Sequence, residues 1–460
     1  MSVRPSQLIA VAALAGGLLL AVLNPMAWSA EAAAGLGLAA GVIGLLATAA
    51  LPEYVTALLF FFVAVVFAIA PPEVVFAGFH SSAIWLVFGG LVIGVGAKRS
   101  GLAERIGRGA AARMPAGYLG IVAGSAALGL ALAFLLPSTM GRIMLMMPIM
   151  IVMADRFGFV RGRPGRAGML LTFVVTTQIP AFTILPAAVP AIVLAGASET
   201  LYGVSPIYGE YLALHFPVLG ALKTVVIVLL AVWLFPDRPD PAGRAPSVPD
   251  AEALSGNERL MAILLLVALG LWVTDFLHGV SPAWVALGVA VVCVLPFVGI
   301  VPADSFNKDL NFGSIIYVSG VLGLGAVLSS TGAGDNLARL ALSLMPLAPD
   351  SPAGNFASIV GLSTVTGMLA TQPGVPAVLA PLAAQIADSA GLSIEQVLML
   401  QAVGFTTVVL PYQTPPAIIG LALAGVALRD GVKLVFTTAM VTMLILLPLD
   451  YLWWRLLGYI

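Results

Sequence analysis

The sequence predicts an all-α polytopic membrane protein with an inverted-topology repeat, two re-entrant hairpins, two broken transmembrane helices and about 11 transmembrane segments. Hydrophobic residues make up 60% of the 460 residues and charged residues only 9%, whereas soluble domains carry about 25% charged residues. Apolar runs of at least about 18 residues recur along the whole chain. Polar, proline-containing breaks interrupt these runs in pairs across the two halves, a pattern typical of a transporter's binding site.

Two of the apolar stretches, 118–156 and 354–388, are expected to fold back at a polar tip. The arm Ala357–Ala370 has about 14 residues, roughly 21 Å, which is too short for a hydrocarbon core of about 30 Å. The arm Tyr118–Leu136 could span, so it is interpreted as re-entrant only by symmetry with the other. The stretches expected to span the membrane, two of them broken, are 7–25, 33–51, 54–71, 82–98, 167–197 (broken), 213–235, 258–276, 282–301, 312–330, 394–426 (broken) and 433–457.

The basic residues give an orientation. When the N-terminus is placed in the cytoplasm, most of the 20 Lys and Arg residues fall on the cytoplasmic side, as the positive-inside rule expects. The protein is therefore predicted to be a multi-pass protein of the inner (cytoplasmic) membrane. Only Arg142 and Lys223 stand within predicted membrane segments. The proline-rich stretch 237–257 can neither pack nor span, and we interpret it as a cytoplasmic linker between the halves.

The two halves resemble each other at three places separated by about 230 positions. The number of crossings between the copies is odd, so the copies are expected to run in opposite directions. Chance similarity among helices rich in Gly and Leu remains the alternative for any single match. The matched segments are Gly89–Gly94 with Gly320–Gly325, Ser138 with Thr371, and Pro186 with Pro415.

The first hairpin tip combines hydroxyl groups with a helix start and an arginine. Ser138 and Thr139 stand at the break, and the next arm begins near Gly141. A helix N-terminus carries unpaired N–H groups and about half a positive charge, which suits an anion. An arginine inside the membrane is costly and by default functional, and Arg142 could grip a carboxylate or sulfate with two parallel bonds. The alternative is that Arg142 pairs with backbone carbonyls or an acid and locks the hairpin.

The second tip and the broken helices offer neutral oxygen atoms. Thr371 and Gln372 supply a hydroxyl and an amide where a helix restarts near Gly374. Proline removes a donor and clashes with the preceding turn, so Thr414-Pro415-Pro416 breaks its helix outright. The freed carbonyl groups could coordinate Na⁺, and Gln178 with Thr183 could do the same in the first copy. A simple turn at the second tip and kinks without function are the alternatives.

These arguments give two overlapping sets of candidate residues and no catalytic residue. The substrate-binding candidates are Ser138, Thr139, Gly141, Arg142, Thr371, Gln372, Gly374, Thr414 and Pro415. The cation-binding candidates are Ser138, Thr139, Gln178, Thr183, Thr371, Gln372, Gln413 and Thr414.

Other features exclude other classes of function. The sequence has no HExxH, GxSxG or P-loop motif, so no enzyme is expected. The single cysteine, Cys293, allows no disulfide and no thiolate metal cluster, and no cofactor is expected beyond a possible Na⁺. The lack of a basic domain argues against nucleic-acid binding.

The chain resembles the divalent anion:sodium symporter family of the ion-transporter superfamily over nearly its whole length. That family carries Ser-Asn-Thr at each tip with a proline ten residues after the serine, and here Ser138 precedes Pro148 and Thr371 precedes Pro381 by that spacing. The sequence Thr414-Pro415-Pro416 also matches. Asparagine is absent from both tips, which puts sodium coupling and substrate identity in doubt. A dicarboxylate-exchanging branch carries Pro-Ser-Asn-Thr-Ala-Arg, which Pro137, Ser138 and Arg142 match.

The resemblance implies a secondary transporter of small divalent anions, of the C4-dicarboxylate type, with Na⁺-coupled symport by an elevator mechanism in a homodimer. The alternatives are a dicarboxylate exchanger without Na⁺, a sulfate or inorganic oxyanion carrier of the same fold, and, from another class, an anion channel. The expected partners are the dianion, Na⁺ or a counter-substrate, and the lipid bilayer. The implied domains are a scaffold (1–115 and 258–345) and a transport domain (116–236 and 346–460), with the linker 237–257 between them.

Overall fold

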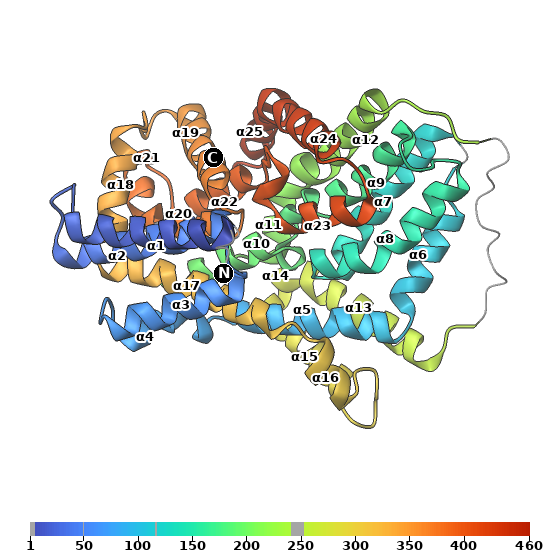
Figure 1. The fold of residues 1–460 in the computed structure, drawn as a ribbon, viewed down its shortest axis with the longest axis horizontal. Helices are drawn as coiled ribbons and strands as arrows, with labels where there is room; N and C mark the ends of the chain where they lie inside the picture. The colour runs from blue at the N-terminus through green and yellow to red at the C-terminus, as the bar shows by residue number, and fades with distance from the viewer. Residues whose placement is uncertain (1–4, 49, 116, 241–252) are drawn as a thin grey trace.

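The computed structural model describes residues 5–48, 50–115, 117–240 and 253–460, and every regular element in these ranges is a helix (Figure 1). The prediction of an all-α fold is confirmed. The elements of the first half are α1 (Pro5–Leu23), α2 (Ala30–Thr48), α3 (Glu53–Val66), α4 (Pro72–Val75), η1 (Ala77–His80), α5 (Ser82–Arg99), α6 (Leu102–Ala112), α7 (Tyr118–Leu135), α8 (Thr139–Arg156), α9 (Pro164–Thr176), η2 (Pro180–Thr183), η3 (Leu185–Ala187), α10 (Val189–Tyr202), α11 (Tyr208–His215), η4 (Phe216–Leu222) and α12 (Lys223–Leu234).

The second half repeats much of this order, and in each half the last long apolar span contains a π-helical segment, η4 or η7. Residues 241–252 of the expected linker lie outside the described residues. The elements of the second half are α13 (Gly256–Val273), α14 (Asp275–His278), α15 (Pro282–Val294), α16 (Ala303–Asp309), α17 (Phe312–Ser330), α18 (Ala333–Ser343), α19 (Pro352–Leu369), α20 (Gly374–Leu379), η5 (Ala380–Leu382), α21 (Ala383–Ala390), α22 (Ile394–Phe405), η6 (Pro411–Gln413), α23 (Pro415–Ala424), α24 (Leu428–Val441), η7 (Thr442–Leu446) and α25 (Leu447–Leu456).

Both predicted helix breaks are present. The first separates α9 from α10 and the second separates α22 from α23. In the described residues, seven helical stretches are long and apolar enough to cross a membrane, or eight if the bent pair from Gly374 to Phe405 is one span. The other expected spans contain shorter apolar helices such as α3 and α15, of 14 and 13 residues.

The length argument for the second hairpin is wrong. Its first arm, α19, begins at Pro352 and has 18 residues, as many as α7 in the first hairpin. At 1.5 Å per residue both arms are about 27 Å long, so length does not separate a re-entrant arm from a spanning one. The extra turn forms because the buried Asn355 side chain donates to the carbonyl oxygens of Ala348 and Ala390 at 2.8 and 3.0 Å. Protein, rather than lipid, therefore surrounds this polar turn.

Glycine residues allow two pairs of helices, α5 with α15 and α17 with α3, to pack in close contact. A Cβ added to Gly89 of α5 would lie 2.7 Å from Ala286 of α15, and one added to Gly320 of α17 would lie 2.6 Å from Ala57 of α3. Such approaches leave no room for a side chain, as is common where membrane helices pack through small residues. Gly94, further along α5, has open space where a Cβ would lie, with no atom within 4 Å.

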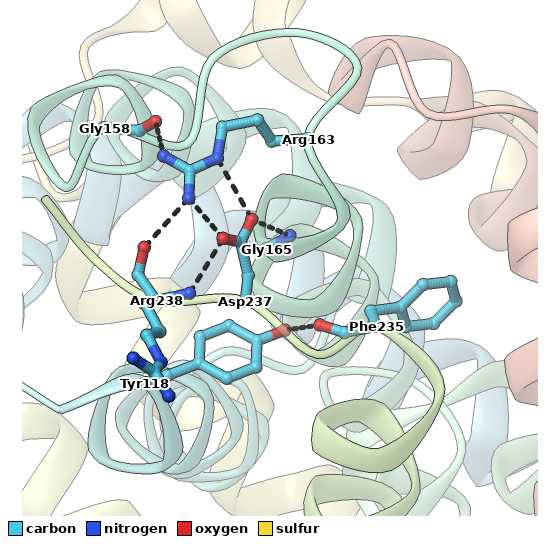
Figure 2. Close-up of polar contacts among 7 residues, drawn as sticks. All are labelled: Tyr118, Gly158, Arg163, Gly165, Phe235, Asp237 and Arg238. Atoms are coloured by element: carbon cyan, nitrogen blue, oxygen red, sulfur yellow. Dashed lines mark hydrogen bonds and ion pairs between the residues drawn. The ribbon is translucent and has the colours of Figure 1, made fainter.

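A polar cluster ties the end of α12 to the hairpin and the broken helix of the first half (Figure 2). The Asp237 carboxylate accepts from the backbone N–H of Gly165 at 2.8 Å and pairs with Arg163, which also donates to the Gly158 carbonyl at 2.8 Å. The Tyr118 hydroxyl donates to the Phe235 carbonyl at 2.5 Å. Burial alone would raise the pKa of Asp237, but the bonds from Arg163 and the backbone outweigh it and hold that pKa below its usual value.

We expect Gly89→Ala to destabilise the protein by about 1–3 kcal/mol, because the new methyl group would overlap Ala286. Thermal unfolding in detergent measures this loss. Gly94→Ala on the same helix is the matched control and should be neutral or stabilising by up to about 1 kcal/mol, since it adds helix propensity in open space. Equal melting temperatures for the two variants would contradict the packing argument.

Candidate functional site

The two hairpin tips and the two helix breaks surround one cavity of about 190 Å³. Segments far apart in the sequence therefore meet here, as the paired breaks predicted. The polar lining residues from the tips and breaks are Ser138, Thr139, Gln178, Gln372 and Thr414.

Helix N-termini face this cavity. The helices α8, α10 and α23 each begin at a residue that lines it, and Pro373, which directly precedes the short α20, lines it as well. At α8 the Ser138 hydroxyl accepts from the Gly141 N–H at 3.2 Å and caps the helix. The N-terminal end of a helix carries a partial positive charge, so several such ends around one cavity favour an anion. The α23 end contributes this field without N–H groups at its first two positions, which are Pro415 and Pro416.

The second tip presents polar atoms that have no protein partner. The Gln372 backbone N–H donates to the Gln413 carbonyl at 2.9 Å, which fixes the tip against the second break. The Gln372 side chain is fully buried, and neither its amide nitrogen nor its oxygen has a hydrogen-bond partner among the described residues. Gly367 makes room for it, since a Cβ there would lie 2.9 Å from the Gln372 Oε1. The Thr371 hydroxyl is likewise buried; no partner lies within hydrogen-bond geometry of it in the described part of the chain, although the Tyr317 hydroxyl of the opposite wall is near enough to interact with it.

The Gln413 side chain, in contrast, is used by the backbone. Its Oε1 accepts from the N–H groups of Val409 and Leu410, both at 2.7 Å, and its Nε2 donates to the Gly367 carbonyl at 2.7 Å. One amide thus satisfies three backbone groups that the break leaves without helical partners, and it holds the second hairpin to the second break.

Arg142 performs the same task in the first half. It is fully buried, and its guanidinium donates to the carbonyl oxygens of Leu136, Ala187 and Thr177, the last two at 3.1 and 2.8 Å. It also donates to the hydroxyl of Thr139 at 2.9 Å. Thr177 caps the end of α9 and Ala187 ends η3, so the side chain joins the tip to both sides of the break. This is the locking arrangement left open by the sequence, and a contact between Arg142 and an anion stays a prediction.

The remaining candidates divide according to whether they reach the cavity. Besides the five polar residues named above, Pro415 lines it. The Thr183 hydroxyl donates to the Pro180 carbonyl at 2.6 Å, away from the lining. The candidates that stand outside the lining are Gly141, Arg142, Thr183, Thr371, Gly374 and Gln413.

Sequence reasoning missed the opposite wall of the cavity. Glu53 at the start of α3 and Asn311, Ser314 and Tyr317 around the start of α17 also line it. They stand at the ends of apolar runs, where polar residues are common for reasons of solvation alone. A pairing of α3 with α17 would have been needed to bring them to the tips, and no local motif encodes that pairing.

Comparison with known proteins agrees with this architecture. The family model described as the sodium:sulfate symporter transmembrane region matches residues 5–460. The chain belongs to this family. Membership makes it a multi-pass membrane transporter, with anions as the family's cargo and sodium as the coupling ion that the family description names.

Two individual proteins extend the comparison. A membrane protein of Cupriavidus necator is 25% identical over 394 residues, which cover 84% of this chain and 77% of that protein. The crystal structure of the YdaH transporter of Alcanivorax borkumensis has a TM-score of 0.53 at 15% identity and covers 87% of this chain and 89% of that one. This second similarity shows a shared transporter fold.

Two variants separate a structural role from a binding role in this symporter family member. Arg142→Ala should lower stability by at least about 2 kcal/mol, because it leaves buried carbonyl groups unpaired. Gln372→Ala removes unpaired atoms, so it should change stability by less than about 1 kcal/mol yet weaken anion binding at least about tenfold.

Thermal unfolding and binding of labelled succinate and sulfate to the purified protein measure the two effects. Unchanged affinity in Gln372→Ala would remove this residue from the site, and unchanged melting of Arg142→Ala would show that its bonds do not hold the hairpin.

Proposed function

We propose that this protein is a secondary transporter of small divalent anions of the C4-dicarboxylate type, which bind between the two hairpin tips. The convergence of α8, α10, α20 and α23 on one cavity carries the proposal. The free amide of Gln372 supports the proposal. A buried polar side chain without a hydrogen-bond partner is destabilising, and a bound ligand would complete its hydrogen bonds. The two carboxylates of such a substrate would receive N–H groups from the starts of α8 and α10 in the first half and from the side-chain amide of Gln372 in the second.

We propose Na⁺ as the coupling ion, bound near the second tip. The unpaired oxygens of Thr371 and Gln372 support this position, since Na⁺ is a hard cation that prefers oxygen ligands. At the first break, Arg142 already donates to the available carbonyl groups, so a fixed positive charge stands there in place of a mobile one. That arrangement favours the alternative, exchange of dicarboxylates without Na⁺, which therefore remains the second candidate.

We further propose that the tips and breaks move together against a scaffold, as an elevator, in a homodimer. Glu199 of α10 supports a separable contact: its Oε2 accepts from the Ser82 N–H and hydroxyl at 2.9 and 2.6 Å, at the start of α5. Gln385 of α21 makes a second such bond to Asp335 of α18. Both bonds join the proposed transport domain to the proposed scaffold, and both must open if the cavity moves to the other side of the membrane.

Uptake of labelled succinate into proteoliposomes tests the substrate class. We expect unlabelled malate to compete strongly and sulfate weakly, because the donors at the start of α8 and the Gln372 amide lie at two separate tips, which suits two separated carboxylates. Unlabelled succinate preloaded inside the proteoliposomes should accelerate the entry of labelled succinate, which is the behaviour of a carrier. Strong competition by sulfate would assign an inorganic oxyanion instead, and flux without acceleration by internal substrate would indicate a channel.

Thr371→Ala tests the cation. If its hydroxyl coordinates Na⁺, the Na⁺ concentration for half-maximal uptake should rise at least about tenfold, with little change in melting temperature, because the hydroxyl has no protein partner. Thr366→Ala on α19 is the matched control, since that hydroxyl bonds to the Leu362 carbonyl of its own helix. Uptake that is insensitive to Na⁺ in the unmodified protein and driven by internal dicarboxylate would establish exchange.

A further inference from the structure

Two ionisable side chains lie buried in the last long helices of the two halves, away from the cavity. Lys223 begins α12 and is 1% exposed, and Asp450 lies in α25 and is 0% exposed. Neither lines the cavity between the tips. Lys223 stands 11 residues from the end of the apolar stretch Tyr208–Leu234, about 16 Å inside it. An ionisable residue at such a depth is costly and is by default a functional candidate.

Lys223 is well accommodated as a charged group. Its Nζ donates to the carbonyl oxygen and the hydroxyl of Thr406 at 3.1 and 3.4 Å. Thr406 caps the C-terminal end of α22, where the helix dipole is negative and a cation is stabilised. An ammonium group therefore has both hydrogen-bond acceptors and a favourable field here.

Asp450 has no such support. Both of its carboxylate oxygens are buried without a hydrogen-bond partner among the described residues, and it forms no ion pair there within 4.0 Å. Lys223 is near enough to interact with it electrostatically but does not contact it. A bare, unpaired carboxylate in this position would be strongly destabilising, so in this conformation the group is stable only with a proton bound.

The surroundings offer few other charges. His215 of α11 packs against Trp454, four residues after Asp450 on α25, with ring centroids 5.5 Å apart, and the Tyr211 ring lies 4.4 Å from the His215 ring. His215 is fully buried and neither ring nitrogen has a partner in the described part of the chain. The segments η4 and η7 contribute no titratable residue.

Charged residues of the other neighbouring helices lie far from Asp450 along the helix axes. On α24 the nearest, Lys433, precedes Asp450 by about 17 residues, or roughly 25 Å. On α9, Arg166 is paired with Asp155 at the far end of the hairpin. α22 presents only the neutral Thr406 and Thr407 at this level, its Glu395 being at the opposite end.

A π-helical segment lies a short distance before each of the two ionisable residues in the sequence. η4 (Phe216–Leu222) ends next to Lys223, and η7 (Thr442–Leu446) ends four residues before Asp450. The two segments pack against each other, and η4 also packs against α25. π-helical turns are rare and occur mostly at functional sites. A change of either segment to an α-helix would shift the register by one residue and rotate the ionisable side chain relative to its partner.

We propose that Lys223 and Asp450 form a proton-binding site within the membrane, separate from the anion cavity, that binds and releases one proton in each transport cycle. The proposal rests on the transport function proposed above. In the described conformation the Asp450 carboxyl carries the proton and the Lys223 ammonium binds Thr406. When the π-helical register changes, the ammonium approaches Asp450, the carboxyl O–H bond breaks, the proton passes to water, and an ion pair remains. The site thus changes by one positive charge, which partly balances a dianion.

Asp450→Asn tests the proposal in proteoliposomes. With one proton carried per cycle, an inward gradient of about one pH unit raises succinate accumulation by up to about tenfold in the unmodified protein. In Asp450→Asn the accumulation ratio with and without the gradient should be about one, while succinate–succinate exchange continues. Asp430→Asn, at the exposed start of α24, is the matched control and should keep the response.

An infrared measurement keeps the test independent of transport. The carbonyl band of a protonated carboxylic acid, shifted by exchange into D₂O, should be present at neutral pH in the unmodified protein and reduced in Asp450→Asn relative to Asp430→Asn. An unchanged band, or a variant that still responds to the proton gradient, overturns the proposal. The proposal is also overturned if Asp450→Asn loses its response to a Na⁺ gradient and keeps its response to the proton gradient. If the unmodified protein transports no dianion but the band disappears in Asp450→Asn, the proposed substrate fails and the protonated state of Asp450 stands.

Discussion

The architecture depends on satisfying backbone groups that the helix breaks release inside the membrane. Lipid offers no hydrogen bonds, so irregular backbone persists there only where protein or a cavity completes it. Arg142 does this for the first break by donating to the carbonyl groups on both sides of it. Gln413 does it for the second, where one amide serves two N–H groups and one carbonyl. Each side chain also fastens a hairpin tip to a broken helix, and so fixes the shape of the cavity.

The two solutions differ in charge, and this difference makes the halves chemically unequal. A guanidinium group leaves a permanent positive charge beside the first tip, whereas the amide of Gln413 leaves the second tip neutral. The unpaired atoms of Thr371 and Gln372 also lie at the second tip. Among the described residues of the two tips, the buried oxygen atoms without a partner therefore belong to the second tip. A fold with two similar halves can in this way bind one cation where a fully symmetric pair of tips would bind two.

The sequence predicted the local features of the site and missed its long-range bonds. Proline and glycine act through their own backbone, so the breaks and tips were visible without any partner. The acceptors of Arg142 lie up to 45 positions away, at Ala187, and nothing near the arginine identifies them. The length of α19 was underestimated because Asn355 makes its first turn stable through bonds to distant backbone. The π-helical segments carry no composition of their own, and neither η4 nor η7 could be told from ordinary apolar helix.

Lys223 connects the proposed proton-binding site to the anion cavity through a short run of backbone. Its ammonium group binds Thr406, which caps α22, and the chain then runs through residues 407–410 and the short η6 to Gln413, whose carbonyl accepts from the Gln372 N–H. If the ammonium leaves Thr406 to pair with Asp450, the negative end of α22 loses its counter-charge, and the segment that positions Gln372 loses an anchor. Protonation of Asp450 would favour the anchored arrangement. A proton and an anion would then stabilise the same conformation from two separate places, which is the thermodynamic requirement for coupling between them.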